Sequence, residues 1–193
     1  MNALNSVLEP GRKARSQSFF IKRLGTGYGL NPDSVYLLDT KDFEHWVQAG
    51  LDELNPQNAK AFLERGMKLY SGDYLPERRF EDWCINERER LLVIYLRGAE
   101  KLAQVSIRSR DYNNAIYWCE RILEKDNTWE EAYRLLMYCY YMKNNRPQSV
   151  KWYRKCCQVL MDEMGVKPLD ATKEMHRMVL EAGPLEMFEE LEM

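Results

Sequence analysis

After Asp39 the apolar residues recur every three to four positions, which is the period of amphipathic helices. The first stripes predict helices beginning near Phe43, after Asn55–Pro56, and from about 81 to 108. Four more helices are predicted at about 112–125, 129–143, 147–162 and 170–180. Thr128 with Glu131 predicts a capping box at the start of the second of these four, and Asp170 is predicted to cap the last.

The N-terminal residues follow a different pattern. Residues 2–8 read as the end of a helix, and apolar runs at 19–24, 28–30 and 35–38 predict three short strands. The glycines between the first two runs predict a tight turn. Fewer than ~40 residues bury too little surface for a core, so this piece is not expected to fold alone.

The helical part contains a weak internal repeat with an offset of about 34 residues. Trp118 aligns with Trp152, and the small residue Ala115 aligns with Ser149. Upstream, Leu102 aligns with Leu136 and Ala99 with Tyr133. This is the period of tetratricopeptide helix pairs, which stack as hairpins and serve mostly as protein-binding surfaces.

Charge is unevenly distributed along the 193 residues, although the net charge is only −2. The first thirty residues carry a cluster of cations, namely Arg12, Lys13, Arg15, Lys22 and Arg23, against Glu9 alone. The last thirteen carry five glutamates and no Lys or Arg. The asymmetry points to nucleic acid at the N-terminal end.

Cysteine usage and hydropathy also indicate the cellular compartment. None of the five cysteines forms a Cys-x-x-Cys pair, and all lie in helical patterns, so buried thiols of a reducing compartment are predicted. No apolar run approaches the ~18 residues of a membrane span, and no signal peptide opens the chain. We therefore predict a cytoplasmic protein that does not contact a membrane.

Nothing in the sequence predicts catalysis or a cofactor. His45 and His176 lie on separate helices without a second ligand at metal spacing, so surface or half-buried histidines are expected. Nucleophile elbows are absent, and Gly25-x-Gly27 lacks the later glycine and helix of a dinucleotide loop. We expect a protein that is not an enzyme and has no catalytic, metal or cofactor site.

Two features are candidates for binding. A glycine-tipped hairpin flanked by Lys22 and Arg23 suits contact with DNA phosphates, although short basic hairpins are common. Aromatic residues crowd the repeat, and packing between helices is the commoner role for each. Some are alternatively predicted to line a groove for a partner, with Tyr117, Tyr133, Tyr140, Tyr141 and Trp152 as candidates.

The hairpin segment Phe20-Ile-Lys-Arg-Leu-Gly-Thr-Gly-Tyr-Gly-Leu30 resembles the wing of response-regulator-type winged-helix DNA-binding domains. Residues 2–8, ahead of Glu-Pro-Gly, resemble the end of the recognition helix. The resemblance implies DNA-backbone contacts from the wing and its neighbours, at Lys22, Arg23, Thr26, Arg12, Lys13 and Arg15. The earlier strands, two helices and most of the recognition helix are missing, so we expect a piece of a longer regulator.

The remainder resembles the bacterial transcriptional activator domain of antibiotic-regulatory-protein-type regulators. Four segments carry the resemblance: Leu69-Tyr-Ser-Gly-Asp-Tyr-Leu-Pro76, Phe80-Glu-Asp-Trp-Cys-Ile-Asn-Glu-Arg-Glu-Arg-Leu91, Arg110-Asp-Tyr-Asn-Asn-Ala115 and Asp162-Glu-Met-Gly-Val-Lys-Pro168. It implies a mainly α fold, a tetratricopeptide-like bundle with a small N-terminal β-hairpin. The expected organisation is a truncated winged helix at 1–38, the activator domain at 39–182 and an acidic tail at 183–193.

Together these features predict a DNA-binding transcriptional activator, of which this chain carries mainly the helical interaction domain. The resemblance implies contact with RNA polymerase or another protein, a regulatory ligand, or dimerisation through the helices. The alternative is a tetratricopeptide adaptor that holds a peptide in its groove, with an incidental basic hairpin and no DNA binding.

Overall fold

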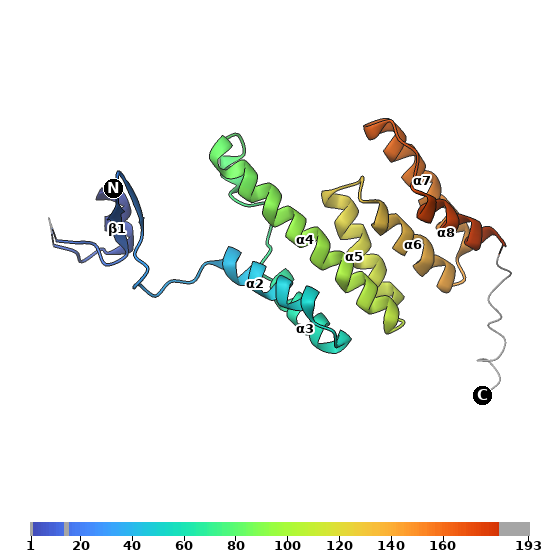
Figure 1. Ribbon diagram of the computed structural model, residues 1–193, viewed down its shortest axis with the longest axis horizontal. Coiled ribbons are helices and arrows are strands. Elements are labelled where there is room, and N and C mark those ends of the chain that lie inside the picture. The colour runs from blue at the N-terminus through green and yellow to red at the C-terminus, as the bar shows by residue number, and fades with distance from the viewer. Residues whose placement is uncertain (1, 14–15, 182–193) are drawn as a thin grey trace. The chain divides into compact units, whose positions relative to one another are not determined.

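The computed structural model describes residues 2–13 and 16–181 and divides the chain into two compact units. The first unit is Met1–Leu38, and the second begins at Asp39. The predicted acidic tail at 183–193 lies outside the described residues. Figure 1 shows the order of the elements.

The first unit contains helix α1 (Asn2–Leu8) and an antiparallel hairpin of β1 (Ile21–Leu24) and β2 (Gly27–Leu30). Gly25 occupies the turn with φ of +58°, a left-handed conformation that glycine adopts without steric cost. The strand predicted at 35–38 is wrong. The sheet has only two strands among the described residues, so this segment lacks a pairing partner, and Val35 is 90% exposed.

Polar contacts hold the first unit together. The Glu9 carboxylate accepts from the backbone N–H groups of Phe19 and Phe20, at 2.5 and 3.2 Å. Asn31 is buried, and its side-chain amide donates to the Phe19 carbonyl at 2.7 Å. No apolar side chain among residues 3–13 and 16–38 is fully buried. The described residues of this unit thus form no buried apolar core, as the small size of the unit predicts.

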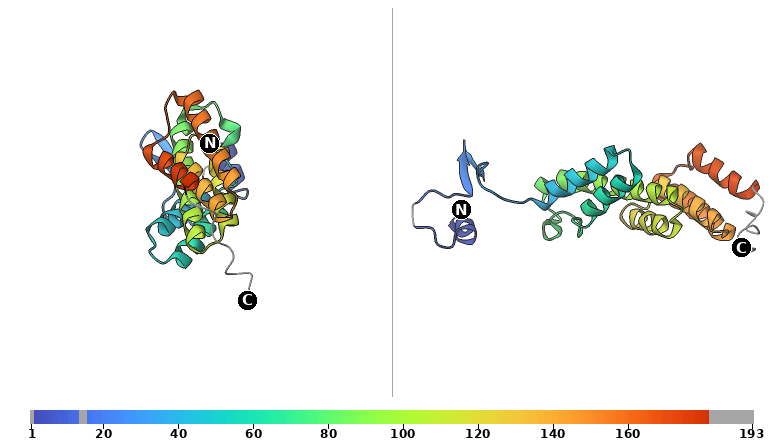
Figure 2. Two further views of the ribbon diagram at one scale, coloured as in Figure 1. Left: turned by 90° about the vertical axis from the view of Figure 1, so that its right-hand side faces the viewer. Right: turned by 90° about the horizontal axis from the view of Figure 1, so that it is seen from below.

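The second unit consists of helices that pack mainly on their sequence neighbours, and Figure 2 shows these helices in a row. The predicted mainly α fold is confirmed. In order the elements are α2 (Asp39–Asp52), α3 (Pro56–Met67), the 3-10 turn η1 (Pro76–Arg78), α4 (Asp82–Arg108), α5 (Tyr112–Lys125), α6 (Glu130–Met142), α7 (Arg146–Met164) and α8 (Asp170–Glu181).

The 34-residue repeat corresponds to the hairpins α4–α5 and α6–α7. The aligned residues Leu102 and Leu136 are both fully buried, as are Ala115 and Ser149. The repeat extends into the turns between helices. Arg110 and Asn144, which are 34 positions apart, both have positive φ, at 60° and 57°.

The residues that follow these two turns are also equivalent. Asp111 caps α5 by accepting from the Asn114 N–H, and Asn145 caps α7 by accepting from the Gln148 N–H. Each carboxylate or amide oxygen satisfies a backbone donor that the first turn of a helix leaves unpaired. The turn and the cap are therefore repeated together with the core positions.

Two predicted helix caps are wrong. Thr128 hydrogen-bonds to Asp126 through its N–H and its hydroxyl, while Glu131 pairs with Arg134, so the capping box does not form. The residue before α6 is Trp129, which makes no side-chain cap. Asp170 is the first residue of α8, and its carboxylate is 2.8 Å from the Lys173 ammonium.

Helical periodicity assigns Trp83 and Ile85 to the apolar stripe of α4, and the structure contradicts this assignment. Trp83 is 65% exposed and Ile85 is 38% exposed, whereas the buried core of this helix extends from Leu91. In the first turns, Cys84 and Arg88 face the preceding loop, to whose carbonyl oxygens both side chains donate. Trp83 therefore points away from the buried side of the helix.

All five cysteines are free thiols, in agreement with the sequence prediction. Four are buried and Cys157 is half-buried. Burial raises the pKa of the Cys139 and Cys156 thiols to about 12, so neither forms a reactive thiolate near neutral pH.

Helices α2, α3 and α4 approach closely at Val47, which is fully buried. A Cβ atom added at Gly66 would lie 2.8 Å from Val47 Cγ2 and 3.2 Å from the Val47 backbone nitrogen. A Cβ atom at Gly98 would lie 2.9 Å from Val47 Cγ1. The two glycines let both neighbouring helices contact α2 at the same residue.

We predict that Gly66→Ala destabilises the helical unit. The added methyl group would clash with the Val47 side chain and crowd the Val47 backbone nitrogen, which cannot rotate away. Overpacking of this kind costs about 1–3 kcal/mol, partly offset by the ~1 kcal/mol better helix propensity of alanine. Chemical denaturation measures the change. Asn58→Ala, at an exposed position of the same helix, is the control and should change the free energy of unfolding by less than about 0.5 kcal/mol. Equal stability of the two variants would contradict the packing described here.

Candidate nucleic-acid interface and partner pockets

The first unit gathers three of the predicted cations around one hollow. Arg12, Lys22 and Arg23 line a space of about 510 Å³, together with Tyr28 and polar residues from the loop before β1. Because β1 side chains alternate between faces, Lys22 and Arg23 would be expected to point apart. Both nevertheless border this hollow, so the structure brings them together with Arg12.

The three cations differ in how accessible they are to a phosphate group. The Lys22 ammonium is 2.7 Å from the Asp33 carboxylate, and this contact lowers the pKa of Asp33. Arg23 donates from Nε to the Gly25 carbonyl at 3.2 Å. Arg12 is largely covered, since its side chain is 21% exposed and faces Glu9 at 3.4 Å. Lys22 and Arg23 are thus more accessible to a phosphate than Arg12.

The remaining predicted wing contacts do not join this hollow. Lys13 is exposed, and Thr26 is exposed in the turn between the strands. Neither lines the space that holds the other cations. Arg15 lies outside the described residues.

The aromatic candidates for a partner groove do not form one surface. Tyr133 is fully buried, and its hydroxyl donates to the Asn127 carbonyl at 2.9 Å. A partner therefore could not contact the Tyr133 side chain in a surface groove. Tyr140 and Trp152 pack against the core, and Tyr141 is half-buried. Tyr117 is 49% exposed and borders a hollow. Core packing therefore accounts for Tyr133, and only Tyr117 among the five faces a surface hollow.

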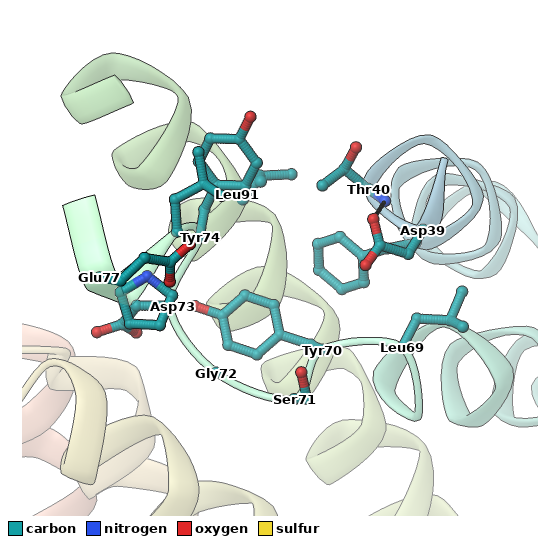
Figure 3. Close-up of a pocket in the computed structure, with 13 residues that line it drawn as sticks. Asp39, Thr40, Leu69, Tyr70, Ser71, Gly72, Asp73, Tyr74, Glu77 and Leu91 are labelled. Atoms are coloured by element: carbon teal, nitrogen blue, oxygen red, sulfur yellow. Dashed lines mark hydrogen bonds between the residues drawn. The ribbon is translucent and has the colours of Figure 1, made fainter. Parts of the chain in front are cut away.

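A hollow of about 320 Å³ lies where the loop after α3 meets the start of α2. Figure 3 shows Tyr70 in its centre, with Asp39 and Thr40 on one side and Asp73 and Glu77 on the other. Three carboxylates border this space, and no lysine or arginine of the described residues does. The hollow therefore suits a cationic group of a partner.

Tyr70 connects this hollow to the core. Its ring stacks on Tyr95 with centroids 4.4 Å apart, and its hydroxyl lies near the Asp73 carboxylate. Burial, followed by the charge of Asp73, raises the pKa of Tyr70 to about 12. Asp73 also accepts from the Lys125 ammonium at 2.7 Å, and this hydrogen bond lowers the pKa of Asp73. The loop is thus tied to α5 by a charged contact.

A second hollow of about 280 Å³ lies against the same Tyr70–Gly72 turn. Helix α5 contributes to its lining the aromatic Tyr117 and Trp118, the cationic Arg121 and Lys125, and the acidic Glu124. Arg121 lies over the Tyr117 ring at 5.3 Å and pairs with Glu124 at 2.8 Å. An acidic hollow and a hollow that contains aromatic and cationic side chains therefore share one turn.

Arg88 fixes the loop that forms the first hollow. Its guanidinium donates to the carbonyl oxygens of Tyr74, Leu75, Arg78 and Arg79, at 3.0–3.3 Å. These bonds hold Leu75 in a left-handed conformation with φ of 47°. Arg88 lies in the charged run Glu87–Arg90, and helical periodicity gives no signal for this role.

The described residues contain no group of three or more His, Cys, Asp or Glu that could bind a metal ion. Of the two histidines, His176 stacks on Tyr153 with ring centroids 3.8 Å apart, while His45 is exposed beside Trp46. Burial and the nearby Arg154 lower the pKa of His176. No described helix is long and apolar enough to cross a membrane.

The helical hairpins and the loop between α3 and α4 define the class of the second unit, a tetratricopeptide-like stack. Residues 38–180 match the bacterial transcriptional activator domain, and the chain belongs to this family. The fold is similar to that of Mycobacterium tuberculosis EmbR, which was solved in complex with a low-affinity phosphopeptide. The TM-score is 0.72 at 19% identity, over 86% of this chain and 45% of that one. A search of curated proteins finds no match.

We predict that the contact between Asp73 and Lys125 stabilises the fold in full above about pH 4 and progressively less as pH falls below it. The pKa of Asp73 is lower in the folded state, so its contribution is present above the unfolded pKa of ~3.9 and disappears as pH falls through the folded value. Asp73→Asn should reduce the free energy of unfolding by about 0.5 kcal/mol at pH 7, because both side chains are partly exposed. Thermal unfolding across pH 3–7 measures the difference, which should shrink toward the acid end.

Lys125→Met is the matched control for this contact. Combined with Asp73→Asn, it should cost less than the sum of the two single changes. Strict additivity, or a difference at pH 3 as large as at pH 7, would contradict the proposed ionic contact.

Proposed function

We propose that this chain is part of a DNA-binding transcriptional regulator, with a wing in the first unit and a protein-binding effector domain in the second. The observation that supports this most directly is the placement of a cationic glycine-turn hairpin ahead of a bacterial transcriptional activator domain. In this proposal, residues 1–38 are the end of a winged helix. The lack of a buried apolar side chain among the described residues of that unit agrees with its being a fragment of a larger domain.

The wing would contact the DNA backbone. Lys22 and Arg23 border one hollow with Arg12, and phosphate contacts from such cations hold a protein in position without reading sequence. Binding requires Lys22 to exchange the Asp33 carboxylate for a phosphate. Lys13, Arg15 and Thr26 would extend the contact along the backbone. The base sequence of the DNA would be read by a recognition helix. In this proposal α1, with seven residues, is the end of that helix.

The effector surface would be the turn Tyr70–Gly72 and the two hollows beside it. One hollow is bordered by carboxylates, and the other contains Tyr117, Trp118 and two cations. A protein partner such as RNA polymerase would present a basic group to the first and an acidic or aromatic group to the second. The matched part spans less than half of EmbR, so the activity of such a whole regulator remains a proposal for this chain.

The alternative is a tetratricopeptide adaptor that does not bind DNA. One observation favours it: Lys22 is already neutralised by Asp33, so the hairpin carries less free positive charge than its sequence indicates. In this case the helical hairpins alone would hold a peptide or a second copy of the chain.

The two proposals make different predictions for a regulator that carries the complete winged helix. The first predicts that it binds promoter DNA, and the alternative predicts that it does not. We predict that Lys22→Ala and Arg23→Ala each weaken binding to a cognate fragment and reduce the slope of log K against log salt by about 1, because each removes one phosphate contact. Electrophoretic mobility shifts at several salt concentrations measure this slope.

Arg97→Ala is the control for that experiment. Arg97 is exposed on α4 in the helical unit, so its loss should leave the salt slope unchanged. Wing variants whose slope equals that of the parent would refute the wing contact. Absence of DNA binding by the complete regulator would instead support the adaptor.

A further inference from the structure

Helix α7 carries a basic groove beside α8. Arg146, Pro147, Val150, Lys151 and Arg154 line a hollow of about 350 Å³. Their spacing of about four residues places them on one side of the helix, with the apolar Pro147 and Val150 between the cations. The groove thus combines a small apolar floor with positive charge along its length.

The positive charge of this groove is not compensated within the described residues. Lys151 and Arg154 form no ion pair there, and Arg146 donates to the backbone carbonyl of Leu180. The cations on the neighbouring α8 differ, since Lys173 pairs with Asp170 and Arg177 pairs with Glu174. The groove therefore has capacity for an acidic segment.

The chain leaves α8 at this groove. Tyr153 stacks on His176, and Arg146 contacts Leu180, so α7 and α8 run antiparallel and the end of α8 lies beside the start of α7. The Leu180 side chain is 48% exposed there. Leu180, near the end of α8, consequently lies next to the first cation of the groove.

The residues that follow have the composition that this groove requires. Residues 182–193 lie outside the described residues, and their sequence contains four glutamates and no lysine or arginine. Leu185, Phe188 and Leu191 recur every three positions among these acids. Twelve residues can span up to ~40 Å, while Arg146 to Arg154 on a helix covers only ~12 Å. The segment is long enough to follow the whole groove.

We propose that residues 183–193 dock in the α7 groove of their own chain, with their glutamates paired to Lys151 and Arg154 and an apolar side chain on Val150. The segment lies beyond residues 38–180, so this contact is additional to the family domain.

Carbodiimide cross-linking of the full chain tests this proposal, because it joins a lysine amine to a carboxylate only when the two are in contact. We expect mass spectrometry to find Lys151 joined to Glu186, Glu189 or Glu190. Lys167 is the matched control, as it is exposed and forms no ion pair among the described residues but lies before α8, at its opposite end. Its yield of cross-links to the same glutamates should be several-fold lower. The Lys151 yield should fall as salt rises to 1 M, where the Debye length is only ~3 Å.

A mixture of isotopically light and heavy chains distinguishes contact within one chain from contact between two. Cross-links between chains only would overturn the proposal and make a second copy the occupant. Equal yields at Lys151 and Lys167 would overturn it as well. As a second test, Arg154→Glu should lower the yield at Lys151, and adding Glu189→Lys should restore it through the remaining glutamates. An unaltered yield in Arg154→Glu, with unchanged circular dichroism, would also count against the docked segment.

Discussion

The contact of Val47 with the backbones of two other helices determines where the candidate partner site lies. Gly66 lies near the end of α3, a few residues before the Tyr70 turn, and Gly98 lies about one turn after Tyr95 on α4. Since both glycines touch the same side chain, α3 and α4 are held close enough for Tyr70 to stack on Tyr95. Larger residues at the two glycines would separate these helices and the rings with them.

Charged and polar contacts then shape the loop between the two helices. Arg88 binds four backbone carbonyls on one side of the loop, and Asp73 reaches Lys125 on the other. Neither contact is deeply buried, so each adds only a modest stabilisation. Their main consequence is geometric, because they hold the Tyr70–Gly72 turn between an acidic hollow and one that contains aromatic and cationic groups.

The repeat was predictable from the sequence because it depends on local chemistry. Helical periodicity and the alignment of Leu102 with Leu136 gave the hairpins, and these positions are buried as expected. The role of Arg88 was not predictable, since an arginine that faces backbone carbonyls has the same sequence pattern as one that faces water. Tyr133 was wrongly predicted at a surface for a related reason. A tyrosine whose hydroxyl donates to a backbone carbonyl inside the fold has the same sequence pattern as one at a binding surface. The segment 35–38 has strand-like residues but no partner strand, and pairing is a property of the tertiary structure.

We propose that the helical unit acts on a protein partner through the Tyr70 turn while a separate unit binds DNA. In vitro transcription with the complete regulator, with promoter occupancy measured by footprinting in the same reactions, tests this directly. Tyr117→Ala should abolish most activation at unchanged occupancy, whereas Met161→Ala, at a similarly exposed position of α7, should leave both unchanged. Full activation by the Tyr117 variant, or a loss of activation that only follows a loss of occupancy, would contradict the claim.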